Sequence, residues 1–219
     1  MQFIEHKIPK LVRVDSPSGR VYETPDGNRY PSVTGIVGSL HAEEIAAWRE
    51  KVGDKVADEI SNRAATRGTL IHENCERYLR KEPLTFSMFQ MEEHRMFKCL
   101  VPIMDRIIEV HAMETPLYSD KLQVAGTVDL IARLEDGELY VVDWKTSSKF
   151  KTEEDIPHYF MQCAFYSFAF YERTGIIPSK IKIAMTTEEF GLLEFNQPAA
   201  KWLQNFIEVR NDYREKNGR

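Results

Sequence analysis

The stretch VAGTVDLIARLEDGELYVVDWKTSS, residues Val124 to Ser148, decides the fold of this chain. Apolar residues occupy the even positions from Leu122 to Leu134, which predicts a strand with one apolar face. The run ELYVVDWK, Glu138 to Lys145, is rich in β-branched and aromatic residues and predicts a second strand. Glu135-Asp136-Gly137 lies between them, so we expect a hairpin.

The length of the hairpin loop decides which side chains share a face. A two-residue Asp136-Gly137 turn would place Asp129 and Asp143 on different faces of the sheet. A three-residue loop with Gly137 in the left-handed conformation sets Asp129 directly opposite Asp143. We predict the second register, because it also places two apolar pairs on the core face. These pairs are Val128 with Trp144 and Leu130 with Val142.

Asp129 and Asp143 in this register need a cation between them. Directly opposed Cβ atoms lie about 5 Å apart, so two carboxylates there repel each other. A divalent metal removes the repulsion, and oxygen ligands completed by waters suit Mg²⁺ or Mn²⁺. Lys145 points to the same side and can assist an attacking water. The alternative is an exposed Asp143–Lys145 ion pair beside an unrelated aspartate.

Several motifs in this order resemble the PD-(D/E)XK nuclease superfamily, in its RecB-like branch. Within that branch the chain most resembles the mitochondrial genome maintenance exonuclease and related phage exonucleases. One departure is Thr127-Val128, which replaces the proline-like residue before the first acid. The resemblance extends from Pro31 to about Tyr171. The motifs are G-T-V-D at Gly126–Asp129, V-D-W-K-T-S at Val142–Ser147, P-S-V-T at Pro31–Thr34, R-G-T-L-I-H-E at Arg67–Glu73 and M-Q-x-x-x-Y at Met161–Tyr166.

The resemblance implies hydrolysis of DNA phosphodiester bonds with one or two Mg²⁺ or Mn²⁺ ions as cofactor. The implied metal ligands are His72, Asp129, Asp143 and the carbonyl oxygen of Trp144. Without the resemblance, a lone histidine such as His72 is more often a hydrogen-bonded core residue. Glu76, one helical turn after His72, is expected to orient it.

The implied catalytic set is Lys145, Asp129, Asp143 and Gln162. In it, Lys145 assists the nucleophile and Gln162 helps to position it. A buried amide such as Gln162 needs polar partners, whereas the many aromatic residues around it in the sequence are expected in the core.

Six residues are expected to contact DNA. Pro31-Ser32-Val33-Thr34 opens a short helix with Ser32 as N-cap, and helix N-termini bind phosphate. In the resembled exonucleases this element meets the DNA backbone, although the pattern alone is only a capping signal. Thr146 and Ser147 begin a polar, basic segment, which is also what an ordinary loop looks like. The full set is Ser32, Thr34, Arg67, Thr146, Ser147 and Tyr166.

Composition limits the class of protein. The net charge of -5 argues against binding nucleic acid by bulk attraction, so contacts with DNA must be local. Cys75, Cys99 and Cys163 lie far apart, so we expect neither a disulfide framework nor a zinc ribbon. Nor do we expect the four-cysteine iron-sulfur cluster of some RecB-like nucleases. With no membrane span and no signal peptide in the sequence, we expect a cytoplasmic protein of a bacterium or of a phage-infected host.

The other elements follow from periodicity. Met1–Tyr30 predicts a small edge hairpin, and His41–Asn62 predicts a helix whose apolar stripe packs in the core. Phe86–Ala112 predicts a helical segment kinked at Pro102, forming either a packed layer, which we prefer, or the arch that guides single-stranded DNA in the resembled exonucleases. The stripe is Ile45, Trp48, Val52, Val56 and Ile60. The remaining elements are helices at Ala64–Arg80, Asp155–Arg173 and Pro198–Asn217, and strands at Met113–Ser119, Ile181–Thr186 and Phe190–Phe195.

The expected architecture is one α/β domain over residues 1–219, with a mixed sheet of four to five strands flanked by helices. Its restriction-endonuclease-like catalytic part spans 114–219, after a mainly helical half at 1–113. The expected function is a metal-dependent DNA exonuclease acting on single strands or frayed ends in phage or bacterial DNA metabolism, such as recombination or repair.

Two other functions stay open. One is an endonuclease or a duplex-processing recombination exonuclease of the same fold. The other is a catalytically inactive DNA-binding protein, against which the complete set of reactive side chains argues.

Overall fold

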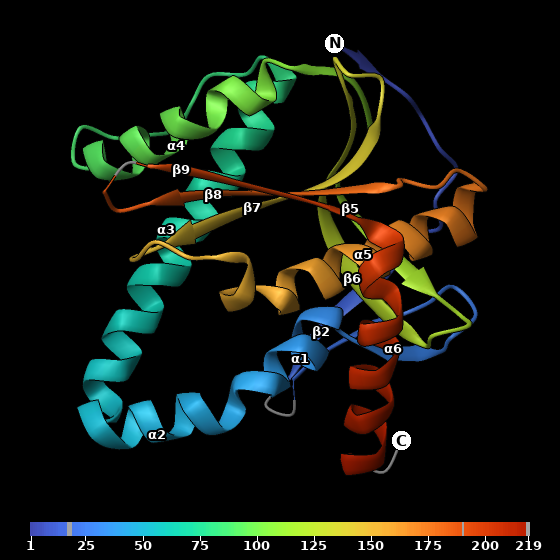
Figure 1. Cartoon of the computed structure of the whole chain (residues 1–219), viewed down its shortest axis with the longest axis horizontal. Helices are drawn as coiled ribbons and strands as arrows, with labels where there is room; N and C mark the ends of the chain where they lie inside the picture. Colours follow the sequence, from blue (N-terminus) through green and yellow to red (C-terminus); the bar gives the residue numbers. More distant parts are fainter. Residues whose placement is uncertain (17–18, 190, 218–219) are drawn as a thin grey trace.

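A mixed six-stranded sheet forms the centre of the computed structural model, which describes residues 1–16, 19–189 and 191–217 (Figure 1). The strand order is β1-β5-β6-β7-β8-β9; the β1/β5 and β7/β8 pairs are parallel and the other neighbours antiparallel. The predicted fold class is confirmed. Within the described residues the sheet has six strands rather than four to five, because a short N-terminal strand adds to one edge. The strands are β1 (Gln2–Phe3), β5 (Ile107–Ser119), β6 (Val124–Leu134), β7 (Leu139–Ser147), β8 (Lys180–Thr187) and β9 (Leu192–Pro198).

The predicted β6–β7 hairpin has the predicted register. Gly137 has φ 82°, and the Leu134 N–H donates to the Glu138 carbonyl oxygen at 3.2 Å, which closes a three-residue loop. Leu130 pairs with Val142, as expected. The next position along each strand toward the open end of the hairpin holds an aspartate, Asp129 on β6 and Asp143 on β7.

The prediction that β6 has a single apolar face is wrong. Val124 and Val128 pack in one core cluster, whereas Leu130 and Ala132 pack in the other. Trp144 belongs to the second cluster and the β6–β7 pairing stops at Leu130, so the expected Val128–Trp144 pair does not form. Helices cover both faces of the sheet, and a strand in that position is apolar on both sides.

Two helical layers enclose the sheet (Figure 1). One core cluster joins the sheet to α1 (Val33–Gly38), α5 (Pro157–Thr174) and α6 (Ala199–Lys216). The other joins it to the C-terminal half of α3 (Asp54–Arg80) and to α4 (Met91–Met104). A smaller sheet is formed by β2 (Val12–Ser16), β3 (Gly19–Glu23) and β4 (Arg29–Pro31). Its Tyr22 and Tyr30 pack against Tyr118 of β5 and Ala125 of β6. It replaces the expected edge hairpin, and Pro17 and Ser18 of that prediction lie outside the described residues.

The boundary between the helices after η1 (Ser39–His41) differs from the prediction. Helix α2 (Ala42–Val52) ends before the predicted end at Asn62, and α3 runs without interruption from Asp54 to Arg80. Gly53 between them has φ 83°, a conformation that side chains rarely adopt, so the break falls there rather than near Arg63. Gly68 is tolerated within α3.

The apolar stripe of α2 and early α3 is not core packing as expected. Ile45 and Ile60 are each 50% exposed and Val56 is 46% exposed. Figure 1 shows the reason: α2 and the first turns of α3 extend below the sheet, away from α4. Ile45, Val56 and Ile60 of the stripe are therefore open to solvent, whereas Trp48 and Val52 are partly buried.

The helix after α3 is shorter than the predicted Phe86–Ala112 segment. Helix α4 contains Pro102 and ends at Met104, and the strand β5 already begins at Ile107. Its Met96, Phe97 and Leu100 are buried in the second cluster, which agrees with a packed layer at α4. The predicted C-terminal elements appear as α5, β8, β9 and α6, although Phe190 of the predicted Phe190–Phe195 strand lies outside the described residues.

Candidate metal and nucleic-acid site

The candidate site begins where β6 and β7 separate. Beyond the Leu130–Val142 pair, β6 continues along β5 and β7 continues along β8. At this fork the backbone N–H of Trp144 donates to Oδ2 of Asp129 at 2.9 Å. A side-chain carboxylate thus takes the place of a strand carbonyl, and it fixes Asp129 beside β7.

Asp143 and Lys145 face the same side of β7. Lys145 Nζ lies 2.5 Å from Asp143 Oδ2, and Gln162 Nε2 on α5 donates to Asp143 Oδ1 at 3.3 Å. Asp143 is only 2% exposed. The ammonium group also lies over the ring of Tyr159, 4.7 Å from its centroid. The three predicted catalytic residues Asp143, Lys145 and Gln162 therefore meet at one point, and the exposed ion pair considered from the sequence is buried instead.

Burial and charge set the protonation of this pair. Desolvation, with the neighbouring Asp129, raises the pKa of Asp143 to about 6 despite the opposing effect of Lys145. Burial alone would lower the pKa of Lys145, but the carboxylates of Asp143 and Asp129 outweigh it and raise that pKa. Lys145 is therefore an ammonium ion beside the acids, and a base only if another cation takes over their charge.

Asp129 also belongs to a second group of ligands that the sequence analysis did not identify in full. Ligand atoms of His72 on α3, Glu114 on β5 and Asp129 all lie within 4.8 Å of one another, and His72 Nδ1 lies 3.5 Å from Asp129 Oδ2. Glu114 was missed because it stands alone in an apolar strand, outside any motif. Its φ of 47° is unusual for a non-glycine residue, which only the folded strand pair reveals.

The residues present fit a divalent cation. Glu114 is exposed as a whole, but its carboxylate faces the acids of the site. Desolvation there and the charges of Asp129, Glu76 and Asp143 raise the pKa of Glu114 to about 8. Carboxylate oxygens with one imidazole suit Mg²⁺ or Mn²⁺, and a cation would relieve the crowding of negative charge. His72, Glu114 and Asp129 would hold such a cation.

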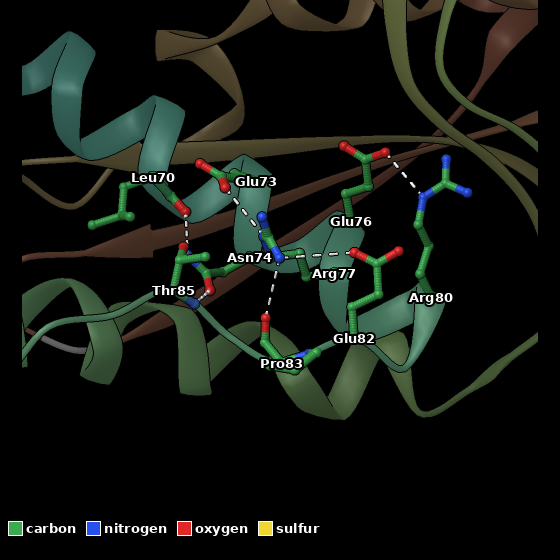
Figure 2. A network of polar contacts seen from close by, with 9 residues as sticks. All are labelled: Leu70, Glu73, Asn74, Glu76, Arg77, Arg80, Glu82, Pro83 and Thr85. Atoms are coloured by element: carbon green, nitrogen blue, oxygen red, sulfur yellow. Dashed lines mark hydrogen bonds and ion pairs between the residues drawn. The ribbon is translucent and has the colours of Figure 1, made fainter.

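A polar network joins the C-terminal half of α3, the helix that carries His72, to the segment that follows it (Figure 2). The buried Asn74 amide donates to the Leu70 carbonyl oxygen at 2.8 Å and to Thr85 Oγ1 at 3.0 Å, and Asn74 Oδ1 accepts from the Thr85 N–H at 2.8 Å. Arg80 Nε donates to Glu76 Oε1 at 3.0 Å. The hydrogen bond of Glu76 is thus with Arg80 and not with His72, contrary to the expectation that it orients His72.

A cleft of about 830 Å³ contains the candidate ligands. His72, Glu114 and Asp129 line it together with Lys145 and Gln162. Its other walls come from the small N-terminal sheet, α1, α2 and α3. The residues on these walls include Arg13, Arg20, Thr34, His41, Ile45, Gly68 and Thr69.

The residues predicted to contact DNA do not all reach this cleft. Thr34 is exposed and lines it. Ser32 is 2% exposed, because its backbone forms a bridge with Ala125 on β6 and its hydroxyl lies 2.5 Å from that of Thr34. Tyr166 is 1% exposed. The side chains of Ser32 and Tyr166 are therefore buried in this conformation, and their role as DNA contacts stays a prediction.

The other three predicted contacts lie at the rim or beyond it. Arg67 forms an ion pair with Glu188 and lines a different, smaller pocket beside α4. Thr146 lies next to Gly68, where an added Cβ atom would be 3.9 Å from Thr146 Oγ1. Ser147 Oγ donates to the Lys149 carbonyl oxygen at 2.7 Å. Thr146 and Ser147 are partly exposed, and their role as DNA contacts stays a prediction.

Comparison with known proteins gives a matching family, and solved structures that resemble the chain include the two that follow. The model of the PD-(D/E)XK nuclease superfamily matches residues 41–190. The solved structure of SSO0001 has a TM-score of 0.45 and 16% identity over 83% of this chain and 73% of its own. A "Putative exonuclease" from Eubacterium rectale has a TM-score of 0.46 and 13% identity over 69% of this chain and 68% of its own. No curated protein matches the chain.

In the described part of the chain, no helix is both long and apolar enough to cross a membrane.

The family match spans more than half of the chain. It contains the β6–β7 fork with Asp129, Asp143 and Lys145 at its centre. The chain belongs to the PD-(D/E)XK nuclease superfamily.

Proposed function

We propose that this protein is a divalent-metal-dependent DNA exonuclease that acts on single strands or frayed ends. The observation that carries the proposal is the meeting of the buried Asp143 with Lys145 at 2.5 Å, next to an open cleft that Lys145 and Asp129 line. A buried ion pair of this kind is costly for stability alone, and perturbed acids in a cleft are typical of a reaction centre.

The proposed metal ligands are Asp129, Asp143, His72 and, in addition to the sequence prediction, Glu114. The Trp144 carbonyl oxygen remains part of the proposed set. When bound, Mg²⁺ or Mn²⁺ would polarise the phosphate and lower the pKa of a bound water. The protein holds its ligands ready for this, since the Trp144 N–H fixes Asp129 and the Gln162 amide fixes Asp143.

Lys145 would act first as a cation. Its ammonium group can hold a phosphate oxygen or the attacking water through charge-assisted hydrogen bonds. A cation held by Asp129 and Asp143 would weaken their stabilisation of the ammonium form, so Lys145 could release its proton to solvent and the resulting amine could accept a proton from the attacking water. Gln162 keeps Asp143 in place during this exchange.

The shape and charge of the cleft support a single strand as substrate. Elements from the small sheet, α1, α2 and α3 bound the cleft on several sides. Arg13 and Arg20 on the small sheet line the cleft and are both paired with Asp15, whereas the acids gather around Asp129. With a net charge of -5, the protein has no overall positive charge to hold a long duplex. Bases that project from a single strand could contact the exposed Ile45.

Cleavage of end-labelled single- and double-stranded oligonucleotides with Mg²⁺, Mn²⁺ or EDTA tests the proposal. We expect metal-dependent release of nucleotides or short products from single strands, and no activity in EDTA. Asp143→Ala should lose at least about 100-fold in rate. Matched folding of wild type and variant is checked by circular dichroism, and equal rates for the two would refute the assignment.

A circular single strand separates this function from an endonuclease of the same fold, because only an endonuclease cuts a substrate without ends. Blunt duplex as the preferred substrate would indicate a duplex-processing recombination exonuclease. An inactive DNA-binding protein would bind the oligonucleotides but release no product with either metal.

A further inference from the structure

Two histidines at the side of the cleft form a pair that the metal site does not use. His41 is the last residue of η1, and His158 lies in the first turn of α5. His41 Nε2 lies 3.2 Å from His158 Nδ1, with the ring centroids 4.6 Å apart. Both residues line the same cleft as Lys145 and Asp129. The pair therefore connects the base of the projecting α2 to the helix that carries Gln162.

Glu44 sets the direction of the hydrogen bonds through the pair. Its Oε2 lies 3.0 Å from His41 Nδ1, and because a carboxylate only accepts, His41 Nδ1 must carry a proton. In a neutral ring His41 Nε2 then accepts from His158 Nδ1. His158 Nε2 is left with a lone pair, and within the described residues it has no hydrogen bond to another side chain or backbone group.

Burial and two nearby lysines oppose protonation of His158. Burial, and then the neighbouring His41, Lys145 and Lys151, lower the pKa of His158 to about 4. An anion placed among these groups would reverse their effect and favour protonation. The titratable and charged groups that face His158 are His41 and Glu44 at the start of α2, Lys145 on β7, Lys151 after β7 and Tyr159 on α5, whose ring centroid lies 4.0 Å from that of His158.

We propose that His41 and His158 form a proton-coupled subsite that holds a phosphate of the bound strand next to the scissile phosphate. The inference rests on the proposed function, because it needs a nucleic-acid strand in the cleft. Phosphate oxygens only accept hydrogen bonds, so His158 must present Nε2–H to the phosphate.

One proton taken from solvent meets this need without breaking any bond of the strand. His158 Nε2–H donates to the phosphate, and His158 Nδ1 now accepts from His41 Nε2–H. The His41 ring keeps its Nδ1–H on Glu44 and carries the positive charge. His158 touches the substrate in this arrangement, and His41 and Glu44 are positioning residues.

The test is binding of a fluorescent single-stranded oligonucleotide in EDTA, which prevents cleavage, at constant ionic strength from about pH 5.5 to 8.5. The wild type should bind more tightly as the pH falls, by up to about tenfold per pH unit for one linked proton. His158→Gln keeps an N–H near the position of Nε2 but cannot titrate. It should bind with a smaller pH dependence than the wild type. His158→Ala should lose affinity at low pH, and its binding should show the same reduced pH dependence as that of His158→Gln.

His41→Ala should reduce the slope as His158→Gln does, because it removes the group that carries the proton. His94→Gln makes the same chemical change beside Phe86 and Phe97, outside the cleft, and should keep the wild-type slope. A full wild-type slope in His158→Gln would overturn the proposal.

The source of the phosphate is identified by comparing 5′-hydroxyl and 5′-phosphorylated oligonucleotides. Equal slopes assign the subsite to an internal phosphodiester, and a slope seen only with the 5′-phosphate assigns it to the strand end. Cleavage with Mg²⁺ is measured separately. A protein that cleaves but binds independently of His158 has the proposed function without this subsite. One that binds through His158 but never cleaves has the subsite without nuclease activity.

Discussion

A Cβ atom on Gly126 would lie 2.7 Å from the hydroxyl oxygen of Tyr166, closer than real Cβ contacts allow. It would also lie 2.7 Å from Val33 Cγ1 on α1. Gly126 thus lets α1 and α5 pack directly against β6, three residues before Asp129. The glycine of the G-T-V-D motif has a packing role that supports the site.

Gly126→Ala should therefore destabilise the protein by about 1–3 kcal/mol, the usual cost of overpacking a core. Urea unfolding measures the change. Gly35→Ala is the matched control, since a Cβ at Gly35 in α1 meets nothing within 4 Å, and it should be neutral or stabilising. Equal stability of Gly126→Ala and wild type would show that α1 and α5 move apart at no cost.

Lys145→Met should separate catalysis from metal binding. The substitution keeps most of the side-chain volume but removes the cation 2.5 Å from Asp143. Cleavage should fall by at least about 100-fold, whereas Mn²⁺ should bind as tightly as in wild type or more tightly, because no ammonium group competes for the carboxylates. Calorimetric titration with Mn²⁺ measures the second effect, and Lys149→Met in the exposed loop is the control. Weaker Mn²⁺ binding by Lys145→Met would contradict the arrangement.

Glu114→Gln should stabilise the metal-free protein and weaken metal binding. The folded-state pKa of Glu114, about 8, lies above its ordinary value of 4.5, so the charged form disfavours folding. This destabilisation is absent below about pH 4.5, grows as the pH rises and is complete above about pH 8. The melting temperature of Glu114→Gln should thus exceed that of wild type at about pH 8.5, and the two should coincide near pH 4.

Mn²⁺ should raise the melting temperature of wild type by more than that of Glu114→Gln, because the variant loses one proposed ligand. Glu73→Gln is the control, since Glu73 lines the cleft but is paired with Arg77 at 3.1 Å. If both variants respond to Mn²⁺ like wild type, Glu114 is not a ligand.

Asn74→Ala should destabilise the protein by about 1–3 kcal/mol, because buried partners on Thr85 and on the helix lose their hydrogen bonds. Arg77→Ala changes the same network at its solvent-exposed side and should cost less than about 1 kcal/mol. Urea unfolding compares the two. A cost for Arg77→Ala as large as that for Asn74→Ala would mean that the surface ion pairs, and not the buried amide, fasten α3.

The sequence by itself determined the β6–β7 hairpin and the reactive residues on it. Gly137 and the loop length fix the register locally, so the facing positions of Asp129 and Asp143 and the direction of Lys145 could be predicted. The fold class followed from the motifs and their order. These features depend on residues close together in the chain, where turn geometry and side-chain alternation leave few choices.

Only the tertiary structure decided which residues from distant elements reach the site and which side chains are buried. Glu114 on β5 joins His72 and Asp129, and His41 meets His158 at the side of the cleft. The apolar stripe of α2, which looks like a core pattern, is left exposed because no described element packs over it, whereas Tyr166 is buried. Periodicity shows which side chains share a face but not whether another element covers that face, because coverage depends on contacts between distant parts of the chain.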